Sequence, residues 1–416
     1  MPAEELLVKG ALAKQAAFRL ASISTETKNA ALEAIASALE SRAAEIIAAN
    51  QADLKAAEEK GMKKSMIDRL ALDEKRIREI AGGVRQVETL NDPIGEVLKM
   101  WKRPNGLMIG QKRVPMGVIA IIYEARPNVT VDAAVLCLKT SNAVILRGGS
   151  EAIQSNRALM RVMQDAAYGA GIPEGTLNLV DDTSRETATE LMRLNGYIDL
   201  LIPRGGAGLI RSVVENATVP VIETAAGNCH VYVDGESDLD MAERIVLNAK
   251  VSRPSVCNAA ETLLIDEAAA EQFVPRIFAA LRENGVEIRG CERCCALDPT
   301  IAAAEEADWY TEYNDYILAV KIVDGIDEAI EHINRYNTKH SEAIVTTSYQ
   351  KAQKFLNEVD AAAVYVNAST RFTDGFEFGF GAEIGISTQK MHARGPMGLE
   401  QLTSLKYIIY GDGQIR

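Results

Sequence analysis

The residue best placed to act as a nucleophile is Cys257, which follows a loop rather than lying inside an apolar run. A helix-like stretch over residues 241–250 leads into this loop, Pro254 stiffens it, and a strand is expected to begin near Thr262. Such a turn can aim the thiol into a cleft, and cations at Lys250 and Arg253 would favour the reactive thiolate. The alternative is a small buried residue at the entrance of a strand, which is the commoner role of a single cysteine.

A second candidate is Asn128, which follows the strand-like run 118–123 within the segment 124–128. An amide at the end of a strand can donate a hydrogen bond to a developing oxyanion. The alternative is a helix cap in front of residues 130–138, a position that asparagine favours.

Two glycine turns with arginines follow strand-like runs, Arg204-Gly205-Gly206 and Arg147-Gly148-Gly149-Ser150. Glycine lets the backbone approach a phosphate closely, and a helix N-terminus favours negative charge. The spacing differs from the usual dinucleotide fingerprint, so each turn alone is as readily a structural one. Together, at the same ends of successive parallel strands, they suggest a dinucleotide lying across the sheet.

Three more cysteines lie together at Cys291, Cys294 and Cys295. A structural zinc site needs four ligands, no second pair completes one, and the four histidines are scattered along the chain. We therefore expect no metal, and a surface turn at these cysteines.

Alternating strands and helices must position these side chains. Apolar strand-like runs between helical stretches indicate parallel sheets covered on both faces, which bind ligands at the carboxyl ends of their strands. The expected strands of a first block are 118–123, 143–146, 177–180, 200–203 and 219–222, with helices such as 152–168 and 186–194 between them. Those of a second block, 231–367, lie near 262–265, 316–323, 343–346 and 363–366.

The first ninety residues have a helical pattern, and one amphipathic stripe is formed by Leu32, Ile35, Leu39, Ala43 and Ile46. After them, Asn105-Gly106 separates two strand-like runs, 94–101 and 107–113, and predicts a hairpin whose two central residues accept positive φ. The predicted fold is α/β: two doubly wound domains with a cleft between them, plus a β-hairpin arm for oligomerisation.

Composition limits the class of protein. The chain has 416 residues, 47% of them hydrophobic and 25% charged, as in ordinary globular proteins of two or three domains. A formal net charge of −13 argues against nucleic acid or an anionic membrane as partner. No signal peptide or membrane span is evident, and six cysteines without a secretion signal suggest reduced thiols in the cytoplasm.

Several blocks in order resemble the aldehyde dehydrogenase superfamily and, more closely, its gamma-glutamyl phosphate reductase (glutamate-5-semialdehyde dehydrogenase) family. The resemblance runs essentially from end to end. It rests on residues 124–130, 202–206, 223–230, 253–259, 366–375 and 378–388.

The resemblance implies an NADPH-dependent oxidoreductase of proline biosynthesis. Cys257 would attack the acyl carbon of L-glutamyl 5-phosphate, release phosphate and form a thioester, which hydride reduces to L-glutamate 5-semialdehyde. Asn128 and the Cys257 backbone N–H would hold the oxyanion. A separate glutamate 5-kinase would supply the labile substrate, perhaps by transient contact.

The resemblance also assigns binding residues. Arg147, Gly148, Ser150, Arg204, Gly205, Gly206 and Glu312 would contact the cofactor, with Glu312 at the nicotinamide ribose. Ser150 replaces the carboxylate of NAD-preferring relatives, and Arg147 would attract a 2′-phosphate, so NADP(H) is favoured over NAD(H); the neighbouring Glu151 argues the other way. Arg253, Arg371 and Ser255 are candidates for the substrate, although either arginine is equally an interdomain ion-pair partner.

Thr224 stands where hydrolytic relatives carry a general-base glutamate. Glu223 is adjacent and would face the opposite side of a strand. A phosphoreductase needs no such base, because activated water would destroy its thioester. The alternatives are a hydrolytic NAD(P)-dependent aldehyde dehydrogenase and a non-catalytic NADP-binding scaffold.

We expect an NADP-binding domain over residues 1–228, with the hairpin arm at about 94–114 and a C-terminal return at 367–395. A catalytic domain carrying Cys257 would cover 229–366, and an arm strand 396–416. The hairpin and the run 402–410 would pair across the subunits of a homo-oligomer.

Overall fold

The computed structural model describes residues 3–62, 64–124, 126–224 and 226–416. Ala125 and Ala225, which belong to two of the sequence motifs, lie outside the described residues. The chain forms two compact units: unit 1 comprises Met1–Thr224, Gly379–Gly385 and Met397–Arg416, and unit 2 comprises Ala225–Phe378 and Ile386–Pro396. Residues 367–378 and 386–395, expected in the cofactor-binding domain, therefore group with the unit that contains Cys257.

Unit 1 begins with helices. Ser24 and Asp73 cap two of them, each accepting a hydrogen bond from a backbone N–H three residues later. The helices are α1 (Glu4–Leu20), α2 (Thr25–Ser41), α3 (Ala43–Glu59), α4 (Lys64–Leu70) and α5 (Glu74–Thr89). The prediction that the apolar stripe forms one helix is wrong, because α2 ends before Arg42 and both Ala43 and Ile46 belong to α3.

A parallel sheet forms the core of unit 1. Its strands are β3 (Val118–Tyr123), β4 (Ala143–Arg147), β5 (Leu177–Leu179) and β6 (Leu200–Arg204), in the order β5-β4-β3-β6. The connections are α6 (Pro127–Lys139), η1 (Ser150–Ala152), α7 (Ile153–Gly169) and α8 (Arg185–Leu191), and α9 (Ala207–Asn216) follows β6. All six side chains of β3 are buried, as a continuous apolar run in a covered sheet requires.

One predicted strand of this sheet is wrong. Residues 219–222 make only an isolated parallel bridge, between Leu201 and Val221. Pro220 lies inside the run and has no N–H to donate to a ladder, although its carbonyl accepts from the Leu201 N–H at 2.8 Å.

Unit 2 is built on a larger parallel sheet in the order β10-β9-β11-β8-β7-β12-β13. The strands are β7 (Cys229–Val233), β8 (Ala260–Asp266), β9 (Glu287–Gly290), β10 (Ala302–Ala303), β11 (Ile317–Val323), β12 (Ser341–Val345) and β13 (Ala363–Val366). The helices are α10 (Leu239–Val251), α11 (Glu267–Glu283), α12 (Glu292–Leu297), α13 (Ile326–Tyr336) and α14 (Tyr349–Glu358), with η2 (Glu306–Tyr310) and η3 (Thr370–Phe372) as short turns. The short pair β14 (Ile386–Ser387) and β15 (Gly395–Pro396) completes the unit.

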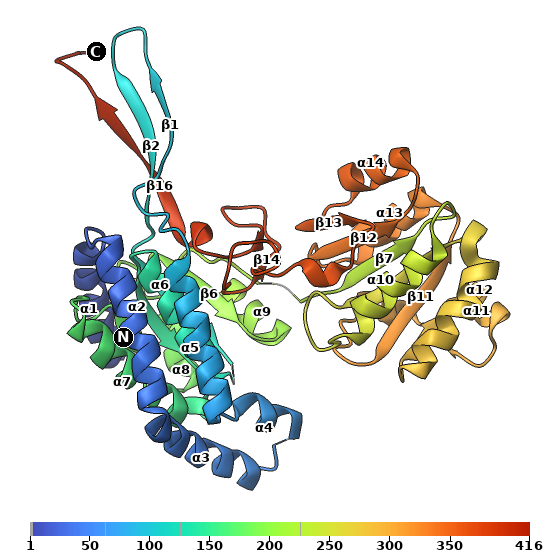
Figure 1. Cartoon of the computed structure of the whole chain (residues 1–416), viewed down its shortest axis with the longest axis horizontal. Coiled ribbons are helices and arrows are strands. Elements are labelled where there is room, and N and C mark those ends of the chain that lie inside the picture. Colours follow the sequence, from blue (N-terminus) through green and yellow to red (C-terminus); the bar gives the residue numbers. More distant parts are fainter. Residues whose placement is uncertain (1–2, 63, 125, 225) are drawn as a thin grey trace. The chain divides into compact units, whose positions relative to one another are not determined.

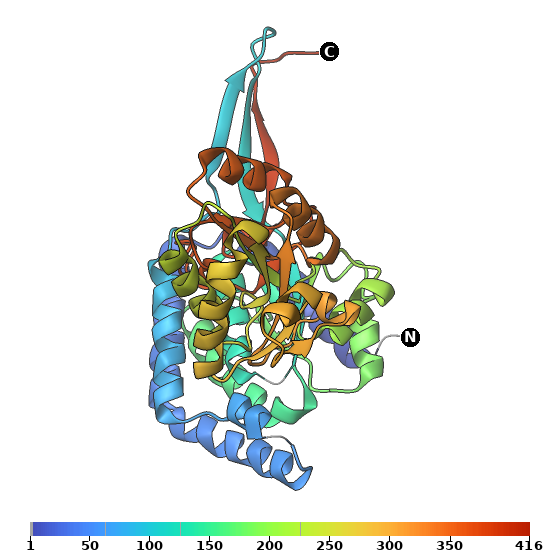
Figure 2. The same cartoon turned by 90° about the vertical axis from the view of Figure 1, so that its right-hand side faces the viewer.

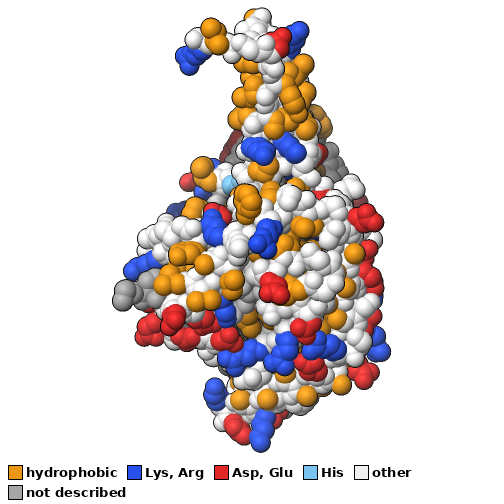
Figure 3. Space-filling view, turned by 90° about the vertical axis from the view of Figure 1, so that its left-hand side faces the viewer, with side chains coloured by type: hydrophobic (Ala, Val, Ile, Leu, Met, Phe, Trp, Pro, Cys, Tyr) orange, Lys and Arg blue, Asp and Glu red, His pale blue; other side chains and the backbone are white. Residues whose placement is uncertain are grey.

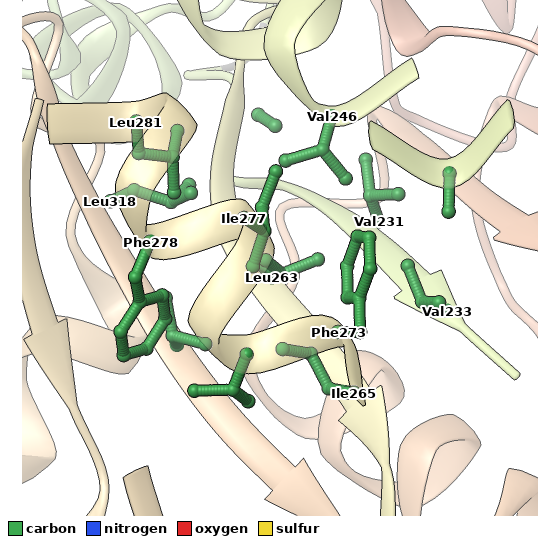
Figure 4. Packing of buried hydrophobic residues seen from close by; sticks show 14 of the residues in the cluster. Val231, Val233, Val246, Leu263, Ile265, Phe273, Ile277, Phe278, Leu281 and Leu318 are labelled. Atoms are coloured by element: carbon green, nitrogen blue, oxygen red, sulfur yellow. The ribbon is translucent and has the colours of Figure 1, made fainter. Parts of the chain in front are cut away.

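The core of unit 2 lies between this sheet and α10 and α11 (Figure 4). Phe273, Ile277 and Phe278 of α11 are fully buried against Val231 of β7 and Leu263 of β8. This packing holds the middle of β7 and β8 against α11.

An arm of three antiparallel strands belongs to unit 1 and extends away from its helices (Figures 1 and 2). It consists of β1 (Val97–Lys102), β2 (Met108–Pro115) and, after η4 (Glu400–Leu402), β16 (Thr403–Tyr410), in the order β1-β2-β16. Trp101 and Tyr407 meet edge to face with ring centroids 6.3 Å apart.

The turn of the hairpin differs from the one predicted. Gly106 has φ of +91°, whereas Asn105 is not among the residues with positive φ. The Gly106 N–H bonds to the Arg103 carbonyl at 2.9 Å and the Arg103 N–H to the Leu107 carbonyl at 2.7 Å. The loop is thus longer than a two-residue turn and requires positive φ only at its glycine.

Apolar side chains gather on the arm (Figure 3). Those that are exposed are Val97, Leu98, Met100, Leu405, Tyr407, Ile409 and Tyr410. Among the described residues, no helix combines the length and the apolar character needed to cross a bilayer.

Candidate active site

Cys257 lies in the loop that joins α10 to β8, three residues before β8 begins, and its side chain is half-buried. It therefore stands at the amino end of its strand, as the sequence predicted. The loop prediction itself is confirmed, because Cys257 follows the helix and is not enclosed in an apolar run.

Gly227 packs directly against this loop from the segment before β7. A methyl group placed on Gly227 would lie 1.5 Å from the carbonyl oxygen of Cys257. Only hydrogen at this position lets the two backbones approach so closely. Gly227 therefore sets the position of the Cys257 peptide group.

Further hydrogen bonds hold the loop in place. The Cys229 thiol donates to the Cys257 carbonyl at 3.2 Å, and burial raises the pKa of Cys229, which keeps this donor protonated. The Asn258 amide donates to the Thr373 carbonyl at 3.0 Å, and the Thr370 hydroxyl donates to the Asn258 carbonyl at 2.7 Å. Sequence reasoning missed these clamping residues, because their contacts join segments that are 28 to 115 residues apart.

Arg371 reaches the same loop from η3. Its guanidinium donates to the Asn258 side-chain oxygen and, through Nε, to Ser252 Oγ at 3.1 Å. Burial, together with repulsion from Arg253, lowers the pKa of Arg371. Arg253 and Arg371, the two predicted substrate arginines, therefore lie within electrostatic range of each other. Ser255, which is half-buried, lies between Arg253 and Cys257 in the sequence.

Glu312 also approaches the nucleophile loop. Its Oε1 accepts a hydrogen bond from the Gly227 N–H at 2.7 Å. The residue predicted to bind the nicotinamide ribose is thus tied to the glycine that touches Cys257. One carboxylate oxygen of Glu312 is engaged in this bond, and the carboxylate brings negative charge close to the loop.

Lys250 does not act as predicted. Its ammonium forms an ion pair with Glu261 at 2.5 Å, and both side chains are fully buried. Burial raises the pKa of Glu261 to about 7 and lowers that of Lys250. Because Glu261 offsets the lysine charge, Lys250 joins α10 to β8 rather than supplying free positive charge to the Cys257 thiolate.

Asn128 lies in the first turn of α6, directly after the N1 proline, Pro127. The N-cap of the helix is Arg126, so the interpretation of Asn128 as a cap is wrong. Instead, Asn128 Nδ2 donates to Asp132 Oδ2 at 3.0 Å. Burial raises the pKa of Asp132 to about 6, against the opposing effect of this hydrogen bond.

Both glycine turns follow strands of one parallel sheet at the same ends, as predicted, but β4 and β6 lie on either side of β3 and are not successive strands. Gly205 and Gly206 follow β6 and lead into α9, while Gly148 follows β4. The Glu124 carboxylate accepts a hydrogen bond from the Gly206 N–H at 3.0 Å. A carboxylate therefore already occupies the backbone donor that the sequence suggested for a cofactor phosphate.

Space at these turns is limited. A methyl group on Gly205 would lie 2.6 Å from the Glu124 carboxyl carbon, and one on Gly148 would lie 2.3 Å from the Asn156 amide nitrogen. At both positions a methyl group would therefore require a neighbouring side chain to move. Arg204, the last residue of β6, is half-buried and exerts an electrostatic effect on Asp132.

Arg147 ends β4 beside the first turn. Its guanidinium donates to the Ser184 carbonyl at 2.9 Å and to the Thr183 carbonyl. Its Nε is buried and, among the described residues, has no hydrogen-bond partner. Ser150 is exposed, and its hydroxyl lies 3.4 Å from a Glu151 carboxylate oxygen.

The three clustered cysteines do not form the predicted surface turn. They lie at the end of β9 and on α12, and Cys294 is fully buried. Within the described part of the chain, no group of three or more His, Cys, Asp or Glu residues is arranged to hold a metal ion.

Comparison with known proteins identifies the family to which this chain belongs. The model of the aldehyde dehydrogenase family matches residues 5–313 and 290–408. The chain belongs to the aldehyde dehydrogenase family, whose members are oxidoreductases.

Its similar relatives narrow the group. The chain is 65% identical over 412 residues to the gamma-glutamyl phosphate reductase of Moorella thermoacetica and 62% identical to that of Heliobacterium modesticaldum, covering 99% of each chain. The crystal structure of gamma-glutamyl phosphate reductase from Thermotoga maritima matches with a TM-score of 0.98 at 50% identity, over 99% of this chain and 100% of that one. Within the family, the chain therefore groups with the gamma-glutamyl phosphate reductases.

Proposed function

We propose that this protein reduces L-glutamyl 5-phosphate to L-glutamate 5-semialdehyde and phosphate, using NADPH, as the second step of proline biosynthesis from glutamate. The observation that carries the proposal is the loop of Cys257, a half-buried thiol whose peptide group is fixed by Gly227 and Cys229. The identity of 65% over 412 residues to the gamma-glutamyl phosphate reductase of Moorella thermoacetica supports the proposed substrate.

In the proposed mechanism, the Cys257 thiolate attacks the acyl carbon of the substrate. The tetrahedral intermediate places negative charge on the carbonyl oxygen, which Asn128 and the Cys257 backbone N–H are proposed to stabilise. The carbon–oxygen bond to phosphate then breaks, and a thioester on Cys257 remains. Arg253 and Arg371 are proposed to hold the anionic groups of the substrate through charge-assisted hydrogen bonds.

The residues around β3, β4 and β6 fit a phosphate-bearing cofactor. The Gly206 N–H already holds an anion, the Glu124 carboxylate, and the buried Arg147 Nε is a donor without a partner among the described residues. When bound, NADPH would supply the hydride that reduces the thioester. Arg147, Gly148, Ser150, Arg204, Gly205, Gly206 and Glu312 are the residues proposed to hold it.

The side chain at position 224 favours reduction over hydrolysis. Thr224 is buried, and its hydroxyl donates to the Pro203 carbonyl at 3.0 Å. A hydroxyl committed in this way is not a base for water. Position 224 therefore supplies no general base that would hydrolyse the proposed thioester, in contrast to the glutamate of a hydrolytic aldehyde dehydrogenase.

We further propose that the exposed apolar arm mediates homo-oligomer formation in the cytoplasm. Contiguous apolar surface of this kind marks an interaction site. Because the substrate is labile, a glutamate 5-kinase must supply it.

The test is NADP⁺ reduction with glutamate 5-semialdehyde, with and without inorganic phosphate. Strict dependence on phosphate is expected, since the reverse reaction needs phosphate to release the acyl group from Cys257. Turnover without phosphate would overturn the reductase assignment in favour of a hydrolytic enzyme.

The Cys257→Ser variant is expected to bind NADPH with unchanged affinity and to lose nearly all turnover in both directions. Retained turnover in this variant would exclude the covalent mechanism, and turnover by the wild type would exclude the scaffold alternative.

A further inference from the structure

The cluster Cys291, Cys294 and Cys295 has no part in the proposed reaction, yet its geometry is specific. Cys291 Sγ and Cys294 Sγ lie 3.7 Å apart, with both thiols reduced. A disulfide needs sulfur atoms about 2.05 Å apart. Cys291 is the N-cap of α12, with extended backbone, and Cys294 lies in the first turn of that helix, so the two sulfur atoms face each other from adjacent turns of chain.

The two thiols differ in access and in surroundings. Cys291 is half-buried and open to small reagents, whereas Cys294 is fully buried. The Ile322 N–H of the neighbouring strand β11 points to Cys291 Sγ at 3.5 Å. The Cys291 thiol contacts Cys294 Sγ at 3.7 Å, and the Cys294 thiol donates to the Val320 carbonyl at 3.6 Å. The contact with Cys294 and the backbone donors lower the pKa of Cys291 to about 5, while the contact with Cys291 and burial raise the pKa of Cys294. A half-buried cysteine with a fully buried one beside it is the arrangement of an attacking and a resolving cysteine.

We propose that Cys291 and Cys294 form a reversible dithiol–disulfide pair, a thiol-modification site that exchanges with low-molecular-weight disulfides of the glutathione class. The site lies at the end of β9 and is chemically distinct from Cys257.

The exchange balances in two steps. The Cys291 thiolate attacks one sulfur of the small disulfide, whose S–S bond breaks, and one small thiolate leaves. Cys294 then loses its proton and attacks Cys291 Sγ in the mixed disulfide, which releases the second small thiolate. The two protein thiols are oxidised by two electrons, and one small disulfide is reduced to two thiols.

Cys295 provides a matched control. Its sulfur faces the Gly290 carbonyl at 3.5 Å and the Ala302 carbonyl at 4.0 Å. Cys295 follows Cys294 directly in the sequence and is half-buried, as Cys291 is. Its sulfur is directed to these two carbonyl groups and not to Cys291 or Cys294. A disulfide that involved Cys295 would therefore contradict the proposed geometry.

The experiment equilibrates the full-length protein with reduced and oxidised glutathione at neutral pH, blocks the remaining thiols after acid quenching, and digests with trypsin. Cleavage after Arg289 and Arg293 separates Cys291 from the other two cysteines, so the disulfide appears as peptide 290–293 linked to peptide 294–321. The linked species is expected in the wild type and in Cys295→Ser, and is expected to disappear in Cys291→Ser and Cys294→Ser. Dithiothreitol should restore all six thiols.

Three outcomes would overturn the proposal: six free thiols at millimolar oxidised glutathione, a linked species that persists in Cys294→Ser, or stable glutathione adducts without the linked species. The same digestion in Cys257→Ser excludes a contribution from the proposed nucleophile. Because a variant can lose the link by misfolding, iodoacetamide alkylation of the wild type at pH 6 gives an independent measure. Cys291 is expected to react at least about tenfold faster than Cys295, because its lowered pKa keeps its thiol ionised at this pH.

Discussion

Asn128 Nδ2 and Asp132 Oδ2 form a hydrogen bond of 3.0 Å across one turn of α6. This bond leaves the second N–H of the Asn128 amide to serve the proposed oxyanion. We predict that Asp132 is a positioning residue for this donor, and its charge state depends on pH because burial raises its pKa to about 6.

We expect Asp132→Leu to lower kcat about tenfold with little change in KM, because the Asn128 amide loses the acceptor that orients it. Removing the oxyanion donor itself, by Asn128→Ala, should cost on the order of a hundredfold. Asp132→Asn keeps an acceptor and should retain most activity, but it should lose any limb with an apparent pKa near 6 from the pH profile of kcat. An unchanged profile in Asp132→Asn would show that Asp132 does not control Asn128.

The same carboxyl makes stability depend on pH. Its pKa is raised from 3.8 to about 6 in the folded state, so the folded chain binds this proton more firmly than the unfolded chain. The contribution of Asp132 to stability is therefore largest below pH 3.8 and declines as the pH rises through about 6. Urea unfolding between pH 4 and 7 should show a smaller decline in Asp132→Asn than in the wild type.

Gly227→Ala is expected to lower turnover by at least about a hundredfold, because its methyl group would displace the carbonyl of Cys257. Gly82→Ala is the matched control: it lies in α5 with nothing within 4 Å of the added methyl group, and should leave activity unchanged. Steady-state kinetics measures the turnover of both variants, and circular dichroism confirms that both are folded. Near-normal turnover in Gly227→Ala would mean that the loop is not held as described.

Glu124 is expected to compete with the proposed cofactor for the Gly206 N–H. Glu124→Gln removes the negative charge at the start of α9 and should tighten NADPH binding about two- to fivefold, as expected for one charge near a helix N-terminus. Fluorescence titration measures the affinity, and Glu215→Gln at the far end of α9 is the control. Weaker binding in Glu124→Gln would place the cofactor phosphates elsewhere.

The free energy of unfolding should fall when one partner of the buried ion pair Lys250–Glu261 is removed. Lys250→Met leaves an unpaired carboxylate in a fully buried position, and we expect it to lower the free energy of unfolding by about 3–5 kcal/mol. The double variant Lys250→Met/Glu261→Leu should recover much of this loss, since neither charge then remains. Urea unfolding of the single and double variants tests both statements, and additive effects would contradict the coupling.

The arm prediction concerns assembly. Tyr407→Asp/Ile409→Asp places two charges on the exposed apolar strand β16 and should dissociate the proposed oligomer to monomers. Tyr349→Asp, at an equally exposed aromatic position on α14, should leave the assembly intact. Sedimentation velocity distinguishes these results, and an unaltered sedimentation coefficient in the double variant would exclude the arm as the interface.

Local patterns predicted the elements well where one physical signal dominated. The run of six apolar residues at β3 was predicted with its observed bounds, because a strand buried on both faces has no polar interruption. The segment 219–222 is also apolar, but it contains Pro220, which has no N–H to donate, and it makes only one isolated bridge; this signal was present in the sequence.

The site was predictable only in part. Cys257 and the glycine turns have chemical signatures that a sequence displays. The roles of Cys229, Asp132 and Glu124 arise from contacts with partners elsewhere in the fold, and Lys250 has an ion-pair partner eleven residues away that no helical spacing indicates. Such pairings depend on how strands and helices pack, which local patterns do not encode.

The discontinuity of unit 1 has a consequence for the order of folding. Its sheet arm joins β2 to β16, whose residues are almost three hundred positions apart, while unit 2 uses a largely continuous stretch of chain. During synthesis from the N-terminus, unit 2 can become compact before the residues that complete unit 1 have been made. Contacts between such distant segments form slowly, so the arm, with its exposed apolar strands, should be the last part to assemble. A newly made chain thus gains the surface proposed for subunit association only after its nucleophile loop is in place.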